Sequence, residues 1–246
     1  NNIKQHFDSP EWLDSFNSLD NLRILNKYHG GEINLIFNAF GNYILESVLS
    51  PKTALVKNTL AFFKEVLQHG RQNKLDIRIV TKLIQILLNK CKSPQKVIKS
   101  MSETCLQFVV ENFTCDETLV EFCTHTIRKN RSVDKEGFQF LATSISIMNE
   151  NISKISNDTL RYIFVTMRLV INSDSGENKA LAKRIVRFLH QLMGKDNFES
   201  YLQFLVVNKV LSVIDAAELV EIAIDRPKTR SSIALSIKER RSQLPF

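Results

Sequence analysis

Ser50-Pro51-Lys52-Thr53 has two counterparts in the chain, Ser9-Pro10-Glu11-Trp12 and Ser93-Pro94-Gln95-Lys96. The three prolines are separated by 41 and 43 residues, and an amphipathic helical pattern follows each of them. A period of about 40 residues with two helices per period is typical of HEAT-type repeats. We therefore expect each of these prolines to mark the start of a helix pair.

Apolar residues recur at three- or four-residue steps through most of the chain, as amphipathic helices require. This periodicity predicts an all-α fold, an α-solenoid of about six HEAT-like helix pairs with about twelve helices. We expect residues 1–9 to be an N-terminal extension and residues 10–246 to form a single domain. The expected helices are 10–28 with 32–48, 52–69 with 76–90, 95–112 with 116–128, a pair after residue 132, a pair around Gly194, and 212–225 with 228–243.

The composition supports a folded helical chain with a basic surface. Hydrophobic residues make up 43% of the 246 residues, and there are only 7 glycines and 5 prolines, which argues against a turn-rich β-sandwich. The formal net charge is +7, which favours an acidic partner: nucleic acid, an anionic membrane or an acidic protein surface.

Motifs for chemistry are missing from the sequence. The four cysteines form no CxxC pair, and no two of the five histidines lie within 22 positions of each other, so we expect no metal site. The glycines do not form a phosphate-binding loop. The chain is therefore expected to be a non-enzyme without cofactors. It has no apolar run of 18 residues and no signal peptide, so we expect a reducing compartment, with the cysteines as core thiols.

The first turns of successive pairs are expected near residues 12, 52, 96, 130 and 177. Equivalent turns of a HEAT array line up on one edge, where an aromatic anchor and a row of cations would suit an acidic protein surface. Trp12 has two readings, a cap on the core or an interface anchor. The candidate binding residues are Trp12, Lys52, Thr53, Lys96, Lys129, Asn130 and Lys179.

With these residues, the chain resembles a TOG domain, most closely those of CLASP and crescerin proteins. The resemblance covers about residues 10–243 and is one of pattern. It rests on Glu11-Trp12-Leu13, Lys52-Thr53-Ala54-Leu55-Val56-Lys57, Leu87-Leu88-Asn89-Lys90-Cys91 with Lys96-Val97-Ile98, the His125 to Lys135 stretch, and Glu177 to Arg184 followed by Phe188-Leu189-His190-Gln191-Leu192.

The resemblance implies a six-repeat tubulin-binding module of a larger microtubule-regulating protein. The turn edge would bind αβ-tubulin or the microtubule lattice, with Trp12 against β-tubulin, and the isolated domain would be monomeric. The implied location is the cytoplasm and cytoskeleton, and more specifically the cilium, axoneme or centrosome. Lys52, Asp134 and Lys179 depart from the family, because each stands where it favours arginine, which binds carboxylates differently from lysine.

Two other functions remain open. A generic HEAT or armadillo scaffold would bind a non-tubulin partner on its concave helical face. Nucleic-acid binding would need arginine-rich helix faces with interleaved aromatic residues, whereas the phenylalanines here recur at core spacing. We therefore expect no nucleic acid and no membrane among the partners.

Overall fold

The computed structural model describes residues 7, 9, 11–70, 72, 74–127, 133–148 and 154–224. It divides into two compact units, Asn1–Ile185 and Val186–Phe246, and each is described on its own. The described residues form eleven α-helices and no strand, apart from one isolated antiparallel bridge between Ile127 and Val133. The predicted all-α repeat fold is therefore confirmed, whereas the single-domain boundary stays a prediction.

The first unit contains four complete helix pairs and the start of a fifth. The short 3₁₀ turn Gly30–Glu32 lies between the first two helices. The helices are α2 (Trp12–Tyr28), α3 (Ile33–Ser47), α4 (Thr53–His69), α5 (Ile77–Lys90), α6 (Lys96–Phe113), α7 (Asp116–Thr126), α8 (Lys135–Met148), α9 (Asn157–Ile171) and α10 (Gly176–Met193), whose second half belongs to the second unit.

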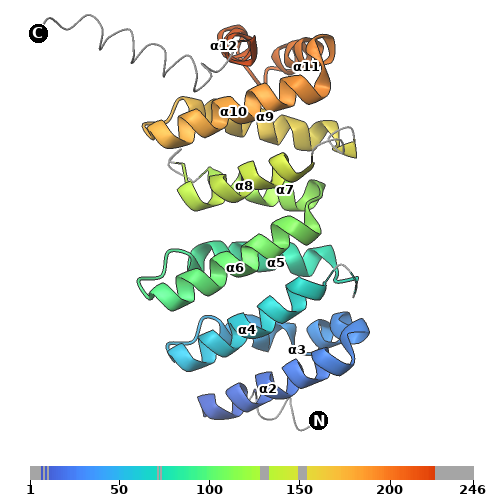
Figure 1. Cartoon of the computed structure of the whole chain (residues 1–246), viewed down its shortest axis with the longest axis vertical. Helices are drawn as coiled ribbons and strands as arrows, with labels where there is room; N and C mark the ends of the chain where they lie inside the picture. The colour runs from blue at the N-terminus through green and yellow to red at the C-terminus, as the bar shows by residue number, and fades with distance from the viewer. Residues whose placement is uncertain are drawn as a thin grey trace, which may run out of the picture. The chain divides into compact units, whose positions relative to one another are not determined.

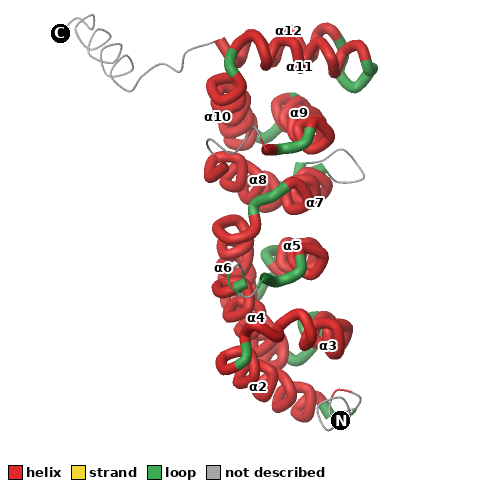
Figure 2. Tube along the Cα trace, turned by 90° about the vertical axis from the view of Figure 1, so that its right-hand side faces the viewer, coloured by secondary structure: helices red, strands yellow, loops and turns green. Residues whose placement is uncertain are grey.

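The pairs stack so that like helices are neighbours in space. Among the first helices of the pairs, α4 packs on α2 and α6, and α6 packs on α8. Among the second helices, α5 packs on α7, and α7 packs on α9. Figure 2 shows these two layers, with α4, α6 and α8 on one side and α3, α5, α7 and α9 on the other. The loops that join successive pairs lie along the left edge in Figure 1.

The Ser-Pro segments form equivalent turns at the helix starts. In each turn the serine Oγ accepts a hydrogen bond from the backbone N–H two residues further on: Ser9 from Glu11 at 3.2 Å, Ser50 from Lys52 at 3.1 Å and Ser93 from Gln95 at 3.3 Å. Since proline has no N–H to compete, this local bond closes the turn. Pro10 itself lies outside the described residues.

The core of the first unit follows the predicted periodicity. The faces predicted for α4, α8 and α9 are buried, including Phe62, Phe63, Phe138 and Phe164. Each fully buried phenylalanine contributes roughly 2–3 kcal/mol of hydrophobic stabilisation. Val97 is apolar, but it lies in the first turn of α6 and its side chain is 52% exposed.

Polar contacts between neighbouring pairs repeat at nearly constant separation. Asn58 on α4 is buried and donates to the Phe16 carbonyl at 3.1 Å and to Asp20 at 2.9 Å, while Arg23 donates to Asn58 at 3.0 Å and to Glu65. The bonds from Asn58 to Phe16 and from Arg23 to Glu65 each span 42 residues. Contacts at one repeat length fix each helix pair in register with the next.

The fourth pair begins after residue 132 as predicted, since α8 begins at Lys135. The turn before it was expected near residue 130, whereas the residue that precedes the helix is Asp134. Its Oδ1 accepts a hydrogen bond from the Gly137 N–H at 3.1 Å and so caps the helix. The residues that precede α2, α4, α6, α8 and α10 are thus 11, 52, 95, 134 and 175, a more even series than the predicted one.

The second unit contains the end of α10 with α11 (Lys195–Val207) and α12 (Val213–Ile224). Phe198, Leu202 and Leu205 of α11 are buried as predicted. The Arg187 Nε donates to the Ile222 carbonyl at 3.1 Å and so connects α10 to α12. The predicted last helix, 228–243, lies outside the described residues.

The four cysteines are free thiols, of which Cys91, Cys105 and Cys123 are buried as predicted and Cys115 is half-buried. No helix in the described part of the chain is long and apolar enough to cross a membrane.

Candidate partner-binding edge

The loops between successive pairs form one line, which we call the interrepeat edge. It comprises residues 48–52, 91–95, 133–134 and 172–175 together with the first turns of α2, α4, α6, α8 and α10. Three contacts connect its successive loops: Gln95 Nε2 donates to Thr53 Oγ1 at 3.2 Å, Lys92 pairs with Asp134, and Lys135 Nζ pairs with Glu177 at 2.8 Å. Each of these contacts joins residues 42 positions apart.

Lys52 and Lys96 are the two exposed cations on this edge without an ion pair among the described residues. Lys52 precedes α4 and Lys96 opens α6, and the first turns of both helices lack acidic residues. The positive end of a helix dipole favours acids and disfavours lysines at these positions. These lysines therefore do not serve helix stability, and they add positive charge to helix starts that already attract anions.

Side-chain capping differs among the helix starts of the interrepeat edge. Glu11, Lys52 and Gln95 make no side-chain cap at the starts of α2, α4 and α6. At the later starts, Asp134 caps α8, and Ser175 Oγ accepts the Asn178 N–H of α10 at 3.4 Å. The first N–H groups of α4 and α6 thus have no cap within the chain, which suits an edge that receives carboxylates from a partner.

Trp12 is half-buried, so the structure assigns it neither to the closed core nor to the fully exposed surface. Its ring packs edge-on against Phe16 with 6.2 Å between the ring centroids. The neighbouring Leu13 is 52% exposed. One end of the interrepeat edge therefore presents a partly apolar surface.

The other predicted residues have different placements. Thr53 accepts the hydrogen bond from Gln95, so its hydroxyl serves the contact between neighbouring pairs. Lys179 is half-buried and lies inside α10, three residues after Gly176, the first residue of the helix. Lys129 and Asn130 lie outside the described residues.

Asp134, one of the departures from the TOG pattern, is only 3% exposed. Its carboxylate pairs with Lys92 and caps α8, so it is committed within the chain. The fourth loop therefore differs from the second and third: where Lys52 and Gln95 stand exposed, it has a buried acid.

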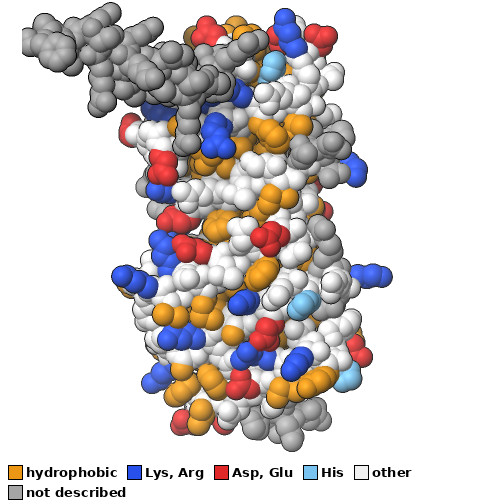
Figure 3. Space-filling view, in the orientation of Figure 1, with side chains coloured by type: hydrophobic (Ala, Val, Ile, Leu, Met, Phe, Trp, Pro, Cys, Tyr) orange, Lys and Arg blue, Asp and Glu red, His pale blue; other side chains and the backbone are white. Residues whose placement is uncertain are grey.

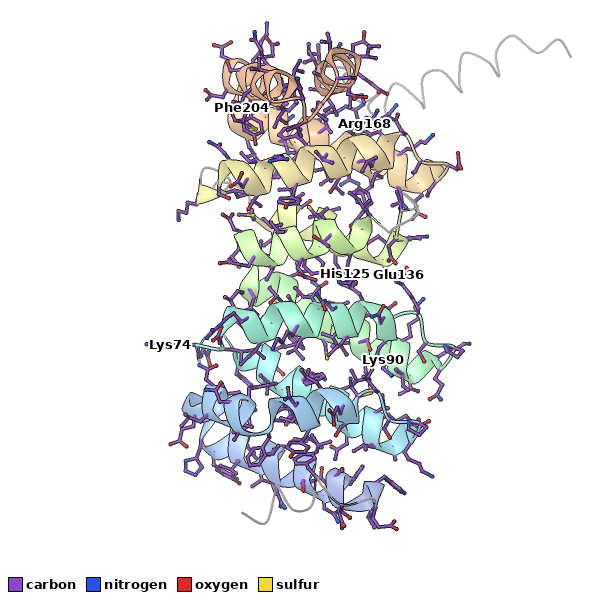
Figure 4. The ribbon with its side chains drawn as sticks, turned by 180° about the vertical axis from the view of Figure 1, so that it is seen from behind. Lys74, Lys90, His125, Glu136, Arg168 and Phe204 are labelled. Atoms are coloured by element: carbon purple, nitrogen blue, oxygen red, sulfur yellow. The ribbon has the colours of Figure 1, made fainter. Side chains whose placement is uncertain are left out.

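Sequence reasoning missed a second set of cations, which adjoin this edge at the ends of the second helices. Figure 4 shows Lys90 and Arg168 toward the same side as Glu136, in the first turn of α8, and Lys74 on the opposite side. Burial lowers the pKa of Lys90. A cation in the last turn of a helix interacts favourably with the dipole, so the sequence signal for these residues is their position just before each predicted break.

The edge is mixed in charge, with cations more prominent around α4 and α6. Figure 3 shows basic and acidic side chains along the left side of the first unit. Glu177 raises the pKa of Lys135 through its hydrogen bond, and the ion pair offsets the positive charge of this lysine. Within the described residues, no group of three or more His, Cys, Asp or Glu is placed to hold a metal ion. The arrangement suits binding to a surface, by charge and by apolar contact.

The fold is that of a helical repeat protein built from stacked helix pairs. No protein-family model matches the chain. No curated protein sequence matches it either.

Three solved structures with a similar arrangement are designed or engineered proteins. A designed armadillo repeat protein has a TM-score of 0.41 at 10% identity over 90% of this chain and 97% of its own. An engineered protein from a structural genomics consortium has 0.39 at 12% over 91% and 95%. A second designed armadillo repeat protein, in complex with the peptide (KR)4, has 0.41 at 10% over 90% and 98%. Likenesses this weak carry no information on function.

Proposed function

We propose that the chain is a non-catalytic module that binds the acidic surface of αβ-tubulin through its interrepeat edge. The observation that carries this proposal is the pair Lys52 and Lys96, which are exposed, unpaired among the described residues and located at helix starts where the dipole disfavours them. Cations in such a row steer an acidic partner and set its register.

Three further features support this partner. Trp12 lies at the same edge and retains exposed surface, as an interface anchor must. The starts of α4 and α6 have no side-chain cap and offer N–H donors to carboxylates. The sequence segments that resemble TOG domains include these same turns. A location in the cytoskeleton or cilium belongs to this proposal.

The test is co-elution of the purified chain with αβ-tubulin in size-exclusion chromatography at low salt, where charge interactions are strongest. Lys52→Glu with Lys96→Glu is expected to weaken binding at least about tenfold, because close like charges repel. Lys64→Glu with Lys82→Glu is the matched control, since it changes the net charge equally on exposed helix surfaces away from the edge. Trp12→Glu is expected to abolish binding while the circular dichroism spectrum remains helical.

The proposal fails if the folded wild-type chain does not co-elute with tubulin, or if the control pair weakens binding as much as the edge pair does. In either case the second candidate function, a scaffold for another protein, takes precedence. A specific observation favours it: Gln85 on α5 donates to Glu121 on α7 at 2.8 Å, and Glu121 contacts His125 at 3.1 Å. These polar side chains lie on the neighbouring second helices α5 and α7. An extended peptide bound across these helices would need polar side chains at such positions.

A further inference from the structure

Two Ser-Pro dipeptides lie at equivalent loops of the interrepeat edge. Ser50 and Ser93 are half-buried, and each is followed by an exposed proline. Both serines accept the backbone N–H two residues further on, at 3.1 and 3.3 Å. The exposed stretch continues beyond Pro94 through Val97. The two turns therefore offer the same local geometry to an enzyme in solution.

The residues around Ser93 are those that a proline-directed serine kinase selects. Such kinases require proline directly after the serine, and a basic residue two positions beyond that proline strengthens recognition. Ser93-Pro94-Gln95-Lys96 has both features, whereas Ser50-Pro51-Lys52-Thr53 has only the proline. We propose that Ser93 is a phosphorylation site for a proline-directed serine kinase, with Ser50 a weaker second site, and that the phosphate switches off partner binding at the interrepeat edge.

The reaction needs a nucleoside triphosphate such as ATP and the external kinase. The Ser93 Oγ forms a bond to the γ-phosphorus, and the bond from that phosphorus to the β-bridging oxygen breaks. ADP leaves, and the hydroxyl proton passes to the catalytic carboxylate of the kinase. The serine only has to give up its hydrogen bond to the Gln95 N–H, which is a local change in the turn.

The phosphate would stand within the cationic part of the edge. Gln95, two residues after Ser93, bonds to Thr53, which adjoins Lys52. A phosphoserine carries about −1.5 to −2 charges at neutral pH. One phosphate therefore offsets most of the combined positive charge of Lys52 and Lys96. With phosphates on both Ser50 and Ser93, the net charge of this part of the edge becomes negative. The regulatory part of this inference rests on the proposed function, because it assumes an acidic partner.

The modified chain is expected to stay folded. Ser93 lies three residues before Lys96, the first residue of α6, and an anion near a helix N-terminus is stabilised by the dipole. The N-cap residue Gln95 provides no side-chain acceptor that the phosphate would displace. Loss of binding would therefore come from charge and not from unfolding.

The first experiment incubates the purified chain with ATP and a cyclin-dependent kinase and locates the phosphate by mass spectrometry. Ser93 is expected to be modified several-fold faster than Ser50. Pro94→Ala is expected to abolish modification at Ser93 while Ser50 serves as an internal control. Ser100, which is exposed on α6 without a following proline, is expected to remain unmodified. Absence of phosphate on Ser93, or a rate unaffected by Pro94→Ala, overturns the site.

The second experiment titrates αβ-tubulin into the unmodified and the phosphorylated chain at low salt. Phosphorylation is expected to weaken binding at least about tenfold, and phosphatase treatment is expected to restore it. Equal binding by both forms overturns the switch while leaving the tubulin proposal intact. If neither form binds tubulin, the proposed function and the switch both fail, whereas the mass-spectrometric result on Ser93 stands on its own.

Discussion

Lys92 forms an ion pair with Asp134, a residue one repeat further along the chain that also caps α8. The carboxylate is 3% exposed, whereas the lysine side chain retains 36% of its exposure. One acid thus performs two tasks: it satisfies the first N–H groups of a helix and it holds neighbouring loops together. Its burial explains why it cannot serve a partner.

Asp134→Ala is expected to destabilise the chain by about 1–2 kcal/mol, because it removes a helix cap while the partly exposed Lys92 can return to water. Asp134→Asn should cost less, since its amide oxygen still accepts the Gly137 N–H. Urea unfolding of the three proteins measures the difference. Equal stability of the wild type and the alanine variant would contradict the capping role.

Asn58→Ala is expected to destabilise the chain by about 1–3 kcal/mol. The substitution leaves the Phe16 carbonyl and the Arg23 guanidinium without the buried amide that now contacts both. Thermal unfolding followed by circular dichroism is the measurement. Asn89→Ala, at an exposed position on α5, is the matched control and should change stability by less than about 0.5 kcal/mol.

Gly70→Ala is expected to destabilise the chain by about 1–3 kcal/mol, because an added Cβ would lie 2.3 Å from Cζ of Phe113 and force that ring to move. Gly31→Ala is the control, since a Cβ there meets no atom within 4 Å. Phe113→Ala combined with Gly70→Ala should recover part of the loss relative to the sum of the single variants. Strict additivity in the double-mutant cycle would rule out the clash.

Stability is expected to fall as the pH rises above about 8.5. Burial raises the pKa of Cys105 and Cys123 to about 12 in the folded chain, whereas thiols in the unfolded chain titrate near about 8.5. Above that pH the unfolded state loses protons that the folded state retains. The contribution is fully present below pH 8.5 and decreases by about 1.4 kcal/mol per pH unit for each thiol until the pH approaches 12.

Urea unfolding at several pH values between 7.5 and 10 tests this dependence. Cys105→Ala with Cys123→Ala should give a shallower fall over the same range, whatever its absolute stability. Because lysine and tyrosine titrate in this range as well, the comparison of slopes isolates the thiols. An identical slope in the variant would show that these cysteines titrate normally.

Most helix boundaries could be predicted because local chemistry sets them. The Ser-Pro turns at Ser50 and Ser93 and the cap at Asp76 act over two or three residues, so a sequence pattern identifies them. The sequence also placed the start of the fourth pair after the polar run 128–132, but it did not identify Asp134 as the cap of α8. The capping role of Asp134 depends on its burial against another repeat, which no local pattern reports.

The candidate site could be predicted only in part, for a similar reason. The period places Lys52 and Lys96 on one edge, and in the structure Lys52 directly precedes α4 and Lys96 is the first residue of α6. The period does not reveal which lysines form ion pairs, because Lys92 and Lys135 pair with acidic residues 42 positions away. The distinction between a free and a paired cation requires the register between repeats, and that register is set by side-chain packing.

The even spacing of the helix starts has a consequence for how such a chain can evolve. Removal of residues 52–94 would join Ser50-Pro51 directly to Gln95-Lys96 and recreate a turn of the same type. Loss of one whole unit, as unequal recombination would produce, would therefore leave the sequence of the connecting turn intact. What such an event would break is the match between Arg23 and Glu65 or Lys92 and Asp134. The polar pairs, unlike the turns, are therefore specific to the present order of the units.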